Sequence, residues 1–340
     1  MHVFRENSST DVSADFYATT ISKADSADHM HQWLYYYIDT AGSVPVSLLG
    51  IVCNLVSLTV WNTQTKYSAS IFLFKYLAVW DTTFLVLFIP VLLFYYKDTD
   101  SSLSITLNTL SCLPRLVSVH TTLQIAVCRW LGVYRPQQVY NGRLLPRRQV
   151  LVGCLVIFVW CLGITLYFTY FQLWVKTASF DKIYDVQVMA VSIVILSVLS
   201  LVFPILLLVV FNVLLIMKLR STSSPVSSSF SRHQQHPGRW GSSRRLTLSV
   251  VLMSLCTVLS YLVGEIFHVS YRYWNMFQMD LRHDELVNFR NIYSAIQLLQ
   301  QINSGINIVF YLAFSSKFRT ALYKDISAHI LREAVCRPHD

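Results

Sequence analysis

Charged residues are scarce in this chain. Aspartate, glutamate, lysine and arginine make up 13% of its 340 residues, whereas hydrophobic residues make up 54% and the mean hydropathy is +0.46. A soluble protein carries about 25% charged residues, so the composition excludes an ordinary soluble domain and favours a membrane protein. The net charge of +9 does not indicate nucleic-acid binding, because the basic residues lie in loops between apolar runs and form no continuous face.

The chain also lacks the patterns of metal centres, disulfide frameworks and active sites. Its seven cysteines include no CxxC pair and no cysteine–histidine spacing of the metal-binding kind. Most of them lie inside apolar runs, where cysteine is usually a small buried hydrophobe: Cys53, Cys128, Cys154, Cys161 and Cys256. No nucleophile–base pair or phosphate-binding loop occurs in a suitable context. We expect no disulfide, no structural metal and no enzymatic activity.

The first forty residues are polar and contain no apolar segment of the kind that a cleaved signal peptide needs, so none is expected. We predict that residues 1–40 form a disordered extracellular tail. Within it, Asn7-Ser8-Ser9 is an N-glycosylation acceptor sequence.

Seven apolar runs follow the tail, and each is near or above the ~20 residues that a helix needs to cross a bilayer. They cover about residues 41–62, 70–96, 103–134, 149–174, 187–217, 246–271 and 290–313. We therefore predict an all-α membrane protein with a seven-transmembrane helix bundle over residues 41–313. Apolar residues then recur at every fourth position from Phe314 to Ile326, which predicts a short amphipathic helix at 314–326 lying on the membrane surface, followed by a tail at 327–340.

The distribution of lysine and arginine among the loops predicts the orientation. The loop after the third run, the Ser-rich loop at 218–245 and the C-terminal tail are basic, whereas the alternate loops mix both signs of charge. Because basic residues stay on the cytoplasmic side, we expect a multi-pass plasma-membrane protein with the N-terminus extracellular and the C-terminus cytoplasmic.

A polar stripe runs along the third apolar run. Its members follow one another at three- and four-residue spacing and therefore share one helix face: Ser111, Arg115, Ser118, Thr122, Ala126 and Arg129. A membrane helix must turn such a stripe toward protein or water. The stripe is therefore expected to line the interior of the bundle.

Several short segments of the apolar runs form recognisable motifs. In chain order, they are Gly50-Ile51-Val52-Cys53-Asn54, Leu77-Ala78-Val79-Trp80-Asp81, Cys128-Arg129-Trp130 with Val133-Tyr134-Arg135-Pro136, Trp160, Pro204, and Asn303-Ser304-Gly305-Ile306-Asn307-Ile308-Val309-Phe310-Tyr311. With these segments, the chain resembles a rhodopsin-like (class A) G-protein-coupled receptor over residues 41 to about 326. The third looks like a degraded DRY segment, and the last resembles NSxxNPxxY with isoleucine in place of proline.

The chain departs from the family pattern at several positions. Ser104 stands where the family has its disulfide cysteine, the loop at 175–188 has no cysteine, and helix six has neither a proline nor the CWxP sequence. Ser260-Tyr261-Leu262-Val263 or Cys256-Thr257-Val258-Leu259 can occupy the CWxP place. Cys128 replaces the acid that restrains the family's arginine, so we expect a weakly locked inactive state and raised basal signalling.

The resemblance also implies roles for individual residues. Asp81 is expected to face Ser118, Asn303 and Asn307 and to bind a sodium ion; a hydrogen-bonded polar cluster without an ion is the alternative. The resemblance assigns coupling to the G protein and the activation switch to Arg129, Tyr134 and Tyr311.

A ligand site is expected in the outer half of the bundle around Arg115, about fourteen residues or roughly 21 Å from Arg129 along the helix. A buried cation beside amides and one acid favours a polar, anionic or peptide ligand; an ion pair between Arg115 and Glu265 that holds two helices together is the alternative. The candidate ligand residues are Ser111, Arg115, Tyr261, Glu265, His268, Tyr293, Gln297 and Gln301.

The sequence therefore predicts a receptor that binds an extracellular ligand, with a neuropeptide receptor of the FMRFamide-like kind as the first hypothesis. The alternatives are an orphan or chemosensory receptor for a small polar or anionic ligand and a seven-span transporter. The implied partners are a heterotrimeric G protein, arrestin, receptor kinases and membrane lipid, with no nucleic acid.

Overall fold

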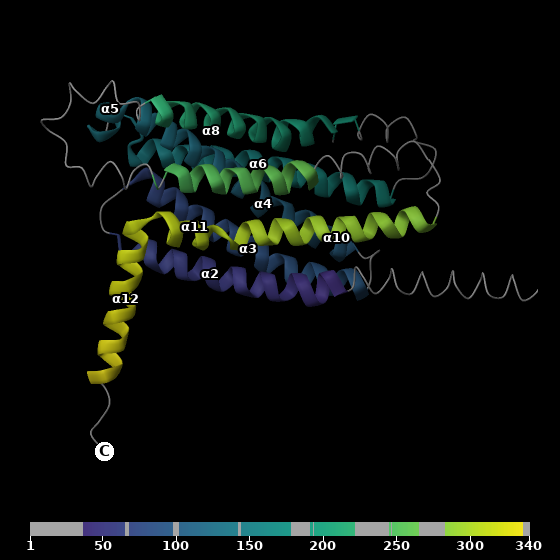
Figure 1. Cartoon of the computed structure of the whole chain (residues 1–340). Helices are drawn as coiled ribbons and strands as arrows, with labels where there is room; N and C mark the ends of the chain where they lie inside the picture. The colour runs from purple at the N-terminus through teal and green to yellow at the C-terminus, as the bar shows by residue number, and fades with distance from the viewer. Residues whose placement is uncertain are drawn as a thin grey trace, which may run out of the picture.

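The computed structural model describes residues 37–64, 68–97, 102–141, 144–177, 191–192, 194–221, 245, 247–264 and 283–335. The labelled elements are η1 (Ile38–Ser43), α2 (Val44–Asn62), α3 (Ala69–Lys97), α4 (Ser102–Tyr134), α5 (Pro136–Tyr140), α6 (Arg147–Thr177), η3 (Val198–Val202), α8 (Phe203–Ser221), α10 (His283–Gly305), α11 (Asn307–Phe314) and α12 (Ser316–Val335). A further helix covers Thr247–Gly264. These described segments contain no strand, and the predicted fold class, an all-α seven-helix bundle, is confirmed (Figure 1).

Six of the helices are long and apolar enough to cross a membrane by their length and composition. They are Ile38–Asn62, Ala69–Leu92, Thr106–Tyr134, Arg147–Phe171, Val194–Lys218 and Thr247–Gly264. The first begins at Ile38, slightly before the predicted start at 41. The tail was predicted at 1–40, but residues 37–40 are already helical. Residues 1–36 of that tail, most of the loop at 218–245 and the end of the sixth span at 265–271 lie outside the described residues.

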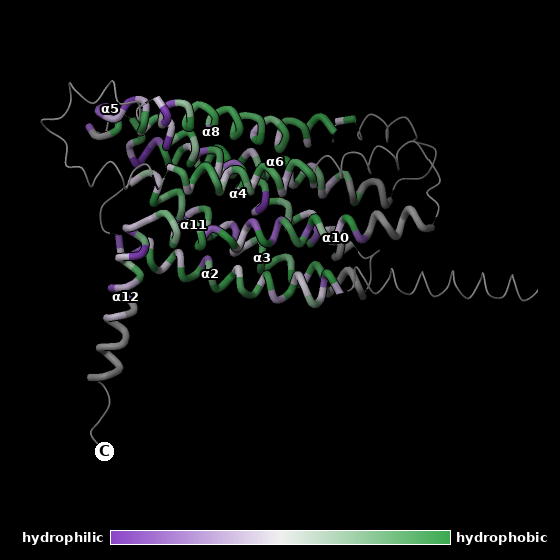
Figure 2. Tube along the Cα trace, in the orientation of Figure 1, coloured by the Kyte–Doolittle hydropathy of each residue, from purple (hydrophilic) through white to green (hydrophobic). Residues whose placement is uncertain are grey.

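The seventh span consists of α10 and α11, and it is too polar to stand among those six. Its polar side chains are turned inward and are at least nine-tenths buried: Gln297, Gln300, Gln301, Asn303, Ser304 and Asn307. Figure 2 shows these hydrophilic stretches on α10 beside the nearly uniform hydrophobic α8. A polar helix is tolerated in lipid when neighbouring helices cover its polar face.

Large apolar side chains, in contrast, lie on the outer face of the bundle and are exposed. Leu155 and Val156 on α6 are 61% and 62% exposed, and Leu206 on α8 is 56% exposed. Contiguous apolar surface of this extent is unusual on a soluble monomer. It is the surface expected of a helix that faces lipid chains.

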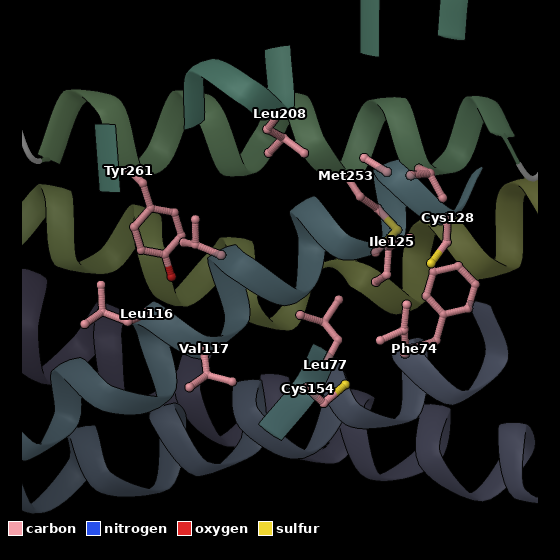
Figure 3. Packing of buried hydrophobic residues seen from close by; sticks show 14 of the residues in the cluster. Phe74, Leu77, Leu116, Val117, Ile125, Cys128, Cys154, Leu208, Met253 and Tyr261 are labelled. Carbon is pink, nitrogen blue, oxygen red and sulfur yellow. The ribbon is translucent and has the colours of Figure 1, made fainter. Parts of the chain in front are cut away.

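Helix α4 lies at the centre of the bundle, where it packs against α3, α6 and α8. Its apolar contacts include Leu116, Val117 and Ile125, which point into the buried core together with Leu77 and Leu208 from neighbouring helices (Figure 3). This central position buries the polar stripe of α4 as well as its apolar residues. Arg115, Ser118 and Thr122 are all at least nine-tenths buried.

Two π-helical turns precede α-helical segments, and each lies beside a proline. η1 ends immediately before α2, which has a proline in its first turn, and η3 ends two residues before Pro204. A proline has no N–H and its ring clashes with the carbonyl one turn earlier. A wider turn relieves that clash without breaking the helix.

A glycine contact brings the first and seventh spans together. A Cβ atom built on Gly305 would lie 2.9 Å from the Gly50 Cα atom, so only glycine at these positions allows this close approach. The helix is interrupted just beyond this point although Ile308 replaces the family's proline: Val309 N–H bonds the Ile306 carbonyl at 2.9 Å, a tighter 3₁₀-type turn.

Helix α12 leaves the end of the bundle roughly at right angles to the spans (Figure 1). Arg319 fixes its start, because its Nη1 atom donates to the carbonyl oxygens of Leu312 and Ala313 at 2.7 and 3.0 Å and so satisfies the last carbonyls of α11. Phe318 is fully buried against the bundle. The helix continues to Val335, beyond the predicted end at residue 326.

Candidate functional site

A buried carboxylate joins three helices in the middle of the bundle. Asp81 on α3 is 1% exposed; the Ser118 hydroxyl of α4 donates to its Oδ1 atom at 2.6 Å, and the Asn307 amide of α11 donates to its Oδ2 atom at 2.8 Å. Charge in an apolar interior is costly unless it is hydrogen-bonded. Both carboxylate oxygens therefore fix the relative position of these helices.

Asn303 was expected at Asp81 but makes a different contact. Its Oδ1 atom lies 3.5 Å from the hydroxyl of Thr257 on the Thr247–Gly264 helix, and this hydroxyl also donates to the Met253 carbonyl at 3.0 Å. Asn303 thus extends the polar interior toward the sixth span. The carboxylate and hydroxyl oxygens of Asp81 and Ser118 are the kind of donor that a hard cation prefers.

Arg115 is a buried ionisable group of the α4 stripe. Its Nη1 atom donates to Gln300 Oε1 on α10 at 2.9 Å, and its Nη2 atom lies 3.2 Å from Cys112 Sγ one turn earlier. Pro114 lies inside α4 immediately before it. The guanidinium therefore bridges the third and seventh spans by a charge-assisted hydrogen bond, the stronger kind.

Gln300 was absent from the predicted ligand set although it holds Arg115. Its amide lies against Gly264 on the sixth span, where an added Cβ atom would come within 2.8 Å of Gln300 Nε2. The sequence did contain a clue to Gln300, because it lies three residues after the predicted ligand residue Gln297 on α10. The structure thus places Gly264, Gln300 and Arg115 together at the meeting point of three spans.

The other predicted ligand residues divide into separate groups. Gln301 is turned toward the first span, where Ser47 donates to its Oε1 atom at 3.1 Å, so the structure does not bring it to Arg115. Ser111 is buried and donates to the Asn108 carbonyl at 2.7 Å. The remaining described members, Tyr261 and Gln297, are buried, and Tyr293 is half-buried.

Glu265 and His268 lie outside the described residues, as does the glycosylation candidate Asn7. The predicted alternative of an ion pair between Arg115 and Glu265 therefore also lies outside the described part of the chain.

An aromatic cluster closes the end of the bundle near Arg129. Trp61, Phe74, Tyr311 and Phe318 come from α2, α3, α11 and α12, with ring centroids 5.0–5.4 Å apart in the contacting pairs. Such edge and stacked contacts add to the burial of apolar area. Tyr311, one of the predicted switch residues, is therefore held by rings from three other helices.

Arg129 lies beside this cluster, and Tyr134 does not. The Arg129 Cζ atom is 5.9 Å from the centroid of the Phe74 ring. Tyr134 instead contacts Trp130 at a centroid distance of 5.1 Å and has Lys218 Nζ 5.2 Å from its ring centroid. The structure therefore separates Tyr134 from the other two predicted switch residues.

Comparison with known proteins gives one finding about the family. Residues 175–328 match the model of the family described as Serpentine type 7TM GPCR chemoreceptor Srw. The match supports a divergent G-protein-coupled receptor. It covers slightly less than half of the chain, from the end of α6 to α12, and the matched family is one of receptors, not of enzymes. No curated protein matches the chain.

For a receptor of this kind, three charged groups on or against the central helix α4 are of interest. Arg115 and Arg129 are fourteen residues apart on α4, or roughly 21 Å along its axis. Asp81 meets the same helix between them, through Ser118. A shift of α4 relative to α10 and α11 would therefore change the contacts of all three groups.

Proposed function

We propose that the chain is a G-protein-coupled receptor in which an extracellular ligand shifts the equilibrium of the helix bundle and a heterotrimeric G protein binds the shifted state. The observation that carries the proposal is the polar interior of a lipid-facing bundle, in which Arg115 and Arg129 lie on α4 and Asp81 is hydrogen-bonded to α4 through Ser118. The match to a receptor family supports it independently.

The ligand we propose is a small polar or anionic molecule recognised by Arg115 and Gln300. A guanidinium pairs with carboxylate or phosphate oxygens through parallel hydrogen bonds, and the Gln300 oxygen that now accepts from Arg115 can be replaced by such a group. The chemoreceptor description of the matched family favours a small ligand over the neuropeptide, which is the second candidate.

The orientation proposed from the loops places the Arg115 cluster toward the outside and α12 along the inner face of the plasma membrane. In this arrangement the ligand enters from the extracellular side and the G protein meets the end that carries Arg129 and the aromatic cluster. A sodium ion, if bound, would be held by oxygens of Asp81 and Ser118.

Purified full-length chain in lipid nanodiscs tests the proposal. Guanine-nucleotide exchange is measured on a panel of purified heterotrimeric G proteins while a library of small carboxylates and phosphates, and then of peptides, is screened. Ligand-dependent exchange is the expected result. Solute flux in reconstituted vesicles, with no exchange on any G protein, would instead identify a transporter.

Two variants test the ligand site. Arg115→Gln should reduce ligand potency at least tenfold, since loss of one charged hydrogen bond costs about 1.5–3 kcal/mol. Arg148→Gln, an exposed arginine at the start of α6, is the control for removing one positive charge and should keep the wild-type potency. Unchanged potency of Arg115→Gln at equal surface expression would remove Arg115 from the site.

A further inference from the structure

Among the residues that the structure describes, the Arg129 side chain has no carboxylate partner. Within the described part of the chain it makes no hydrogen bond or ion pair, and its Nε atom is buried without a hydrogen-bond partner. The residue beside it, Cys128, is a buried thiol. A buried guanidinium held by nothing would be strongly unfavourable, so another interaction must restrain it.

The loops at this end of the bundle cannot supply the missing acid. No aspartate or glutamate occurs between Thr40 and Trp80, between Ser101 and Phe180, or between Val186 and Gly264, and these ranges include all three loops at the end of the bundle where Arg129 lies. Asp325 follows on α12, but its side chain is exposed. The carboxylate of α3, Asp81, is seven residues or roughly 10 Å along the helix from Phe74 and is already bonded to Ser118 and Asn307.

The face of the Phe74 ring is a favourable partner for Arg129. The Arg129 Cζ atom is 5.9 Å from its centroid, within the ~6 Å range in which a guanidinium is attracted by the electron-rich face of an aromatic ring. Phe74 is fully buried, so water does not compete for that face. Its position is also fixed, because Trp61 stacks on it at 5.4 Å and Tyr311 contacts it at 5.0 Å.

We propose that Phe74 is a positioning residue that holds Arg129 in the resting bundle through a cation–π contact, in the place of a carboxylate lock, and that couples Arg129 to Tyr311 through the shared ring. A role of this contact in signalling depends on the proposed receptor function, but the contact itself does not. Any movement of α11 that withdraws Tyr311 from Phe74 frees the ring to shift and thereby releases Arg129.

The first experiment measures the contact without any G protein. The midpoint of thermal unfolding is determined in detergent for the wild type, Phe74→Leu, Arg129→Gln and the double variant. Phe74→Leu is expected to lower the midpoint by clearly more in the wild type than in Arg129→Gln, since contacting pairs are not additive. Equal lowering in both backgrounds would overturn the proposal.

Phe84 provides the matched control. It is a phenylalanine of the same helix, 1% exposed, and it packs against Phe88 with ring centroids 5.9 Å apart. Phe84→Leu should lower the midpoint by the same amount in the wild type and in Arg129→Gln. This equality shows that the coupling at Phe74 is not a general effect of losing a buried ring.

A second substitution separates electrostatics from packing if Phe74→Leu does not fold. Replacing Phe74 by pentafluorophenylalanine keeps the ring but reverses the polarity of its face. The basal rate of nucleotide exchange is expected to rise about 2- to 30-fold, the range of a cation–π contact from exposed to desolvated sites, whereas the same replacement at Phe84 should leave it unchanged. An unchanged basal rate with the fluorinated Phe74 ring would refute the release of Arg129.

The nucleotide-exchange measurements and the thermal-unfolding cycle test different claims. If no ligand and no variant produces exchange, the proposed receptor function fails, and the thermal cycle still decides whether Phe74 holds Arg129. If exchange responds to ligand but the thermal cycle is additive, the receptor function stands and the positioning role of Phe74 is rejected.

Discussion

The close approach of Gly50 and Gly305 gives the sharpest test of the bundle geometry. In Gly305→Ala the new Cβ atom would lie 2.9 Å from the Gly50 Cα atom. Because that neighbour is backbone, no side chain can rotate away, and the two helices must separate by about 0.5–1 Å to reach ordinary carbon–carbon contact.

That separation weakens two hydrogen bonds on either side of the contact. Ser47 donates to Gln301 Oε1 at 3.1 Å, and the Asn54 amide donates to the Ser304 carbonyl at 3.0 Å. An extra 0.5–1 Å brings both beyond hydrogen-bond range. Leaving buried groups unsatisfied costs about 1–3 kcal/mol each, while replacing glycine by alanine in a helix returns about 1 kcal/mol. The expected net loss of stability is about 1–5 kcal/mol.

Stability is measured as the free energy of unfolding in mixed micelles titrated with denaturing detergent. Gly163→Ala is the matched control, because Gly163 lies within α6 and an added Cβ atom would meet nothing within 4 Å. It should leave stability unchanged or raise it slightly. If Gly305→Ala behaves like Gly163→Ala, the first and seventh spans do not touch at these glycines.

Three further predictions concern the polar groups. Asp81→Leu should lower the free energy of unfolding by several kcal/mol, because it leaves Ser118 and Asn307 without their buried acceptor. It should also abolish any effect of sodium on ligand affinity, which is measured by titrating ligand binding against NaCl and KCl. Sodium sensitivity retained in the variant would exclude Asp81 as the ion site. Gln300→Ala should weaken ligand potency and destabilise the protein by about 1–3 kcal/mol, since Arg115 loses its charge-assisted hydrogen bond to the amide oxygen. Wild-type potency and stability would show that the amide does not matter. Cys128→Asp should reduce basal nucleotide exchange by placing an acid beside Arg129, and basal output equal to the wild type would contradict the expectation of a weakly locked resting state.

The helices of the bundle were predictable because lipid selects long apolar runs. The start of α3 and the ends of α2 and α4 differ from the predicted bounds by at most one residue. The end of α12 was placed too early. Ile330 and Ala334 continue the apolar position at every fourth residue beyond Ile326, so the pattern that predicted the helix extends almost to its end at Val335.

The contacts between helices were less predictable, because they depend on how each helix is rotated about its axis. Asn303 and Asn307 lie four residues apart and were expected at the same carboxylate, yet only Asn307 bonds Asp81, on the far side of the break at Ile306. Gln300 and Gln301 are adjacent in sequence but contact different spans. Nothing in the local sequence decides which neighbouring amide reaches Arg115.

The polar seventh span also has a consequence for how the protein is made. The translocation machinery releases a segment into lipid according to its hydrophobicity, and this last segment is the poorest candidate of the bundle. Its Gln301 side chain and its Ser304 carbonyl accept hydrogen bonds from α2, which is synthesised first. The earliest helix must therefore remain available, with Ser47 and Asn54 unsatisfied, until the ribosome has delivered the last one, and a nascent chain truncated before α10 should be retained and degraded.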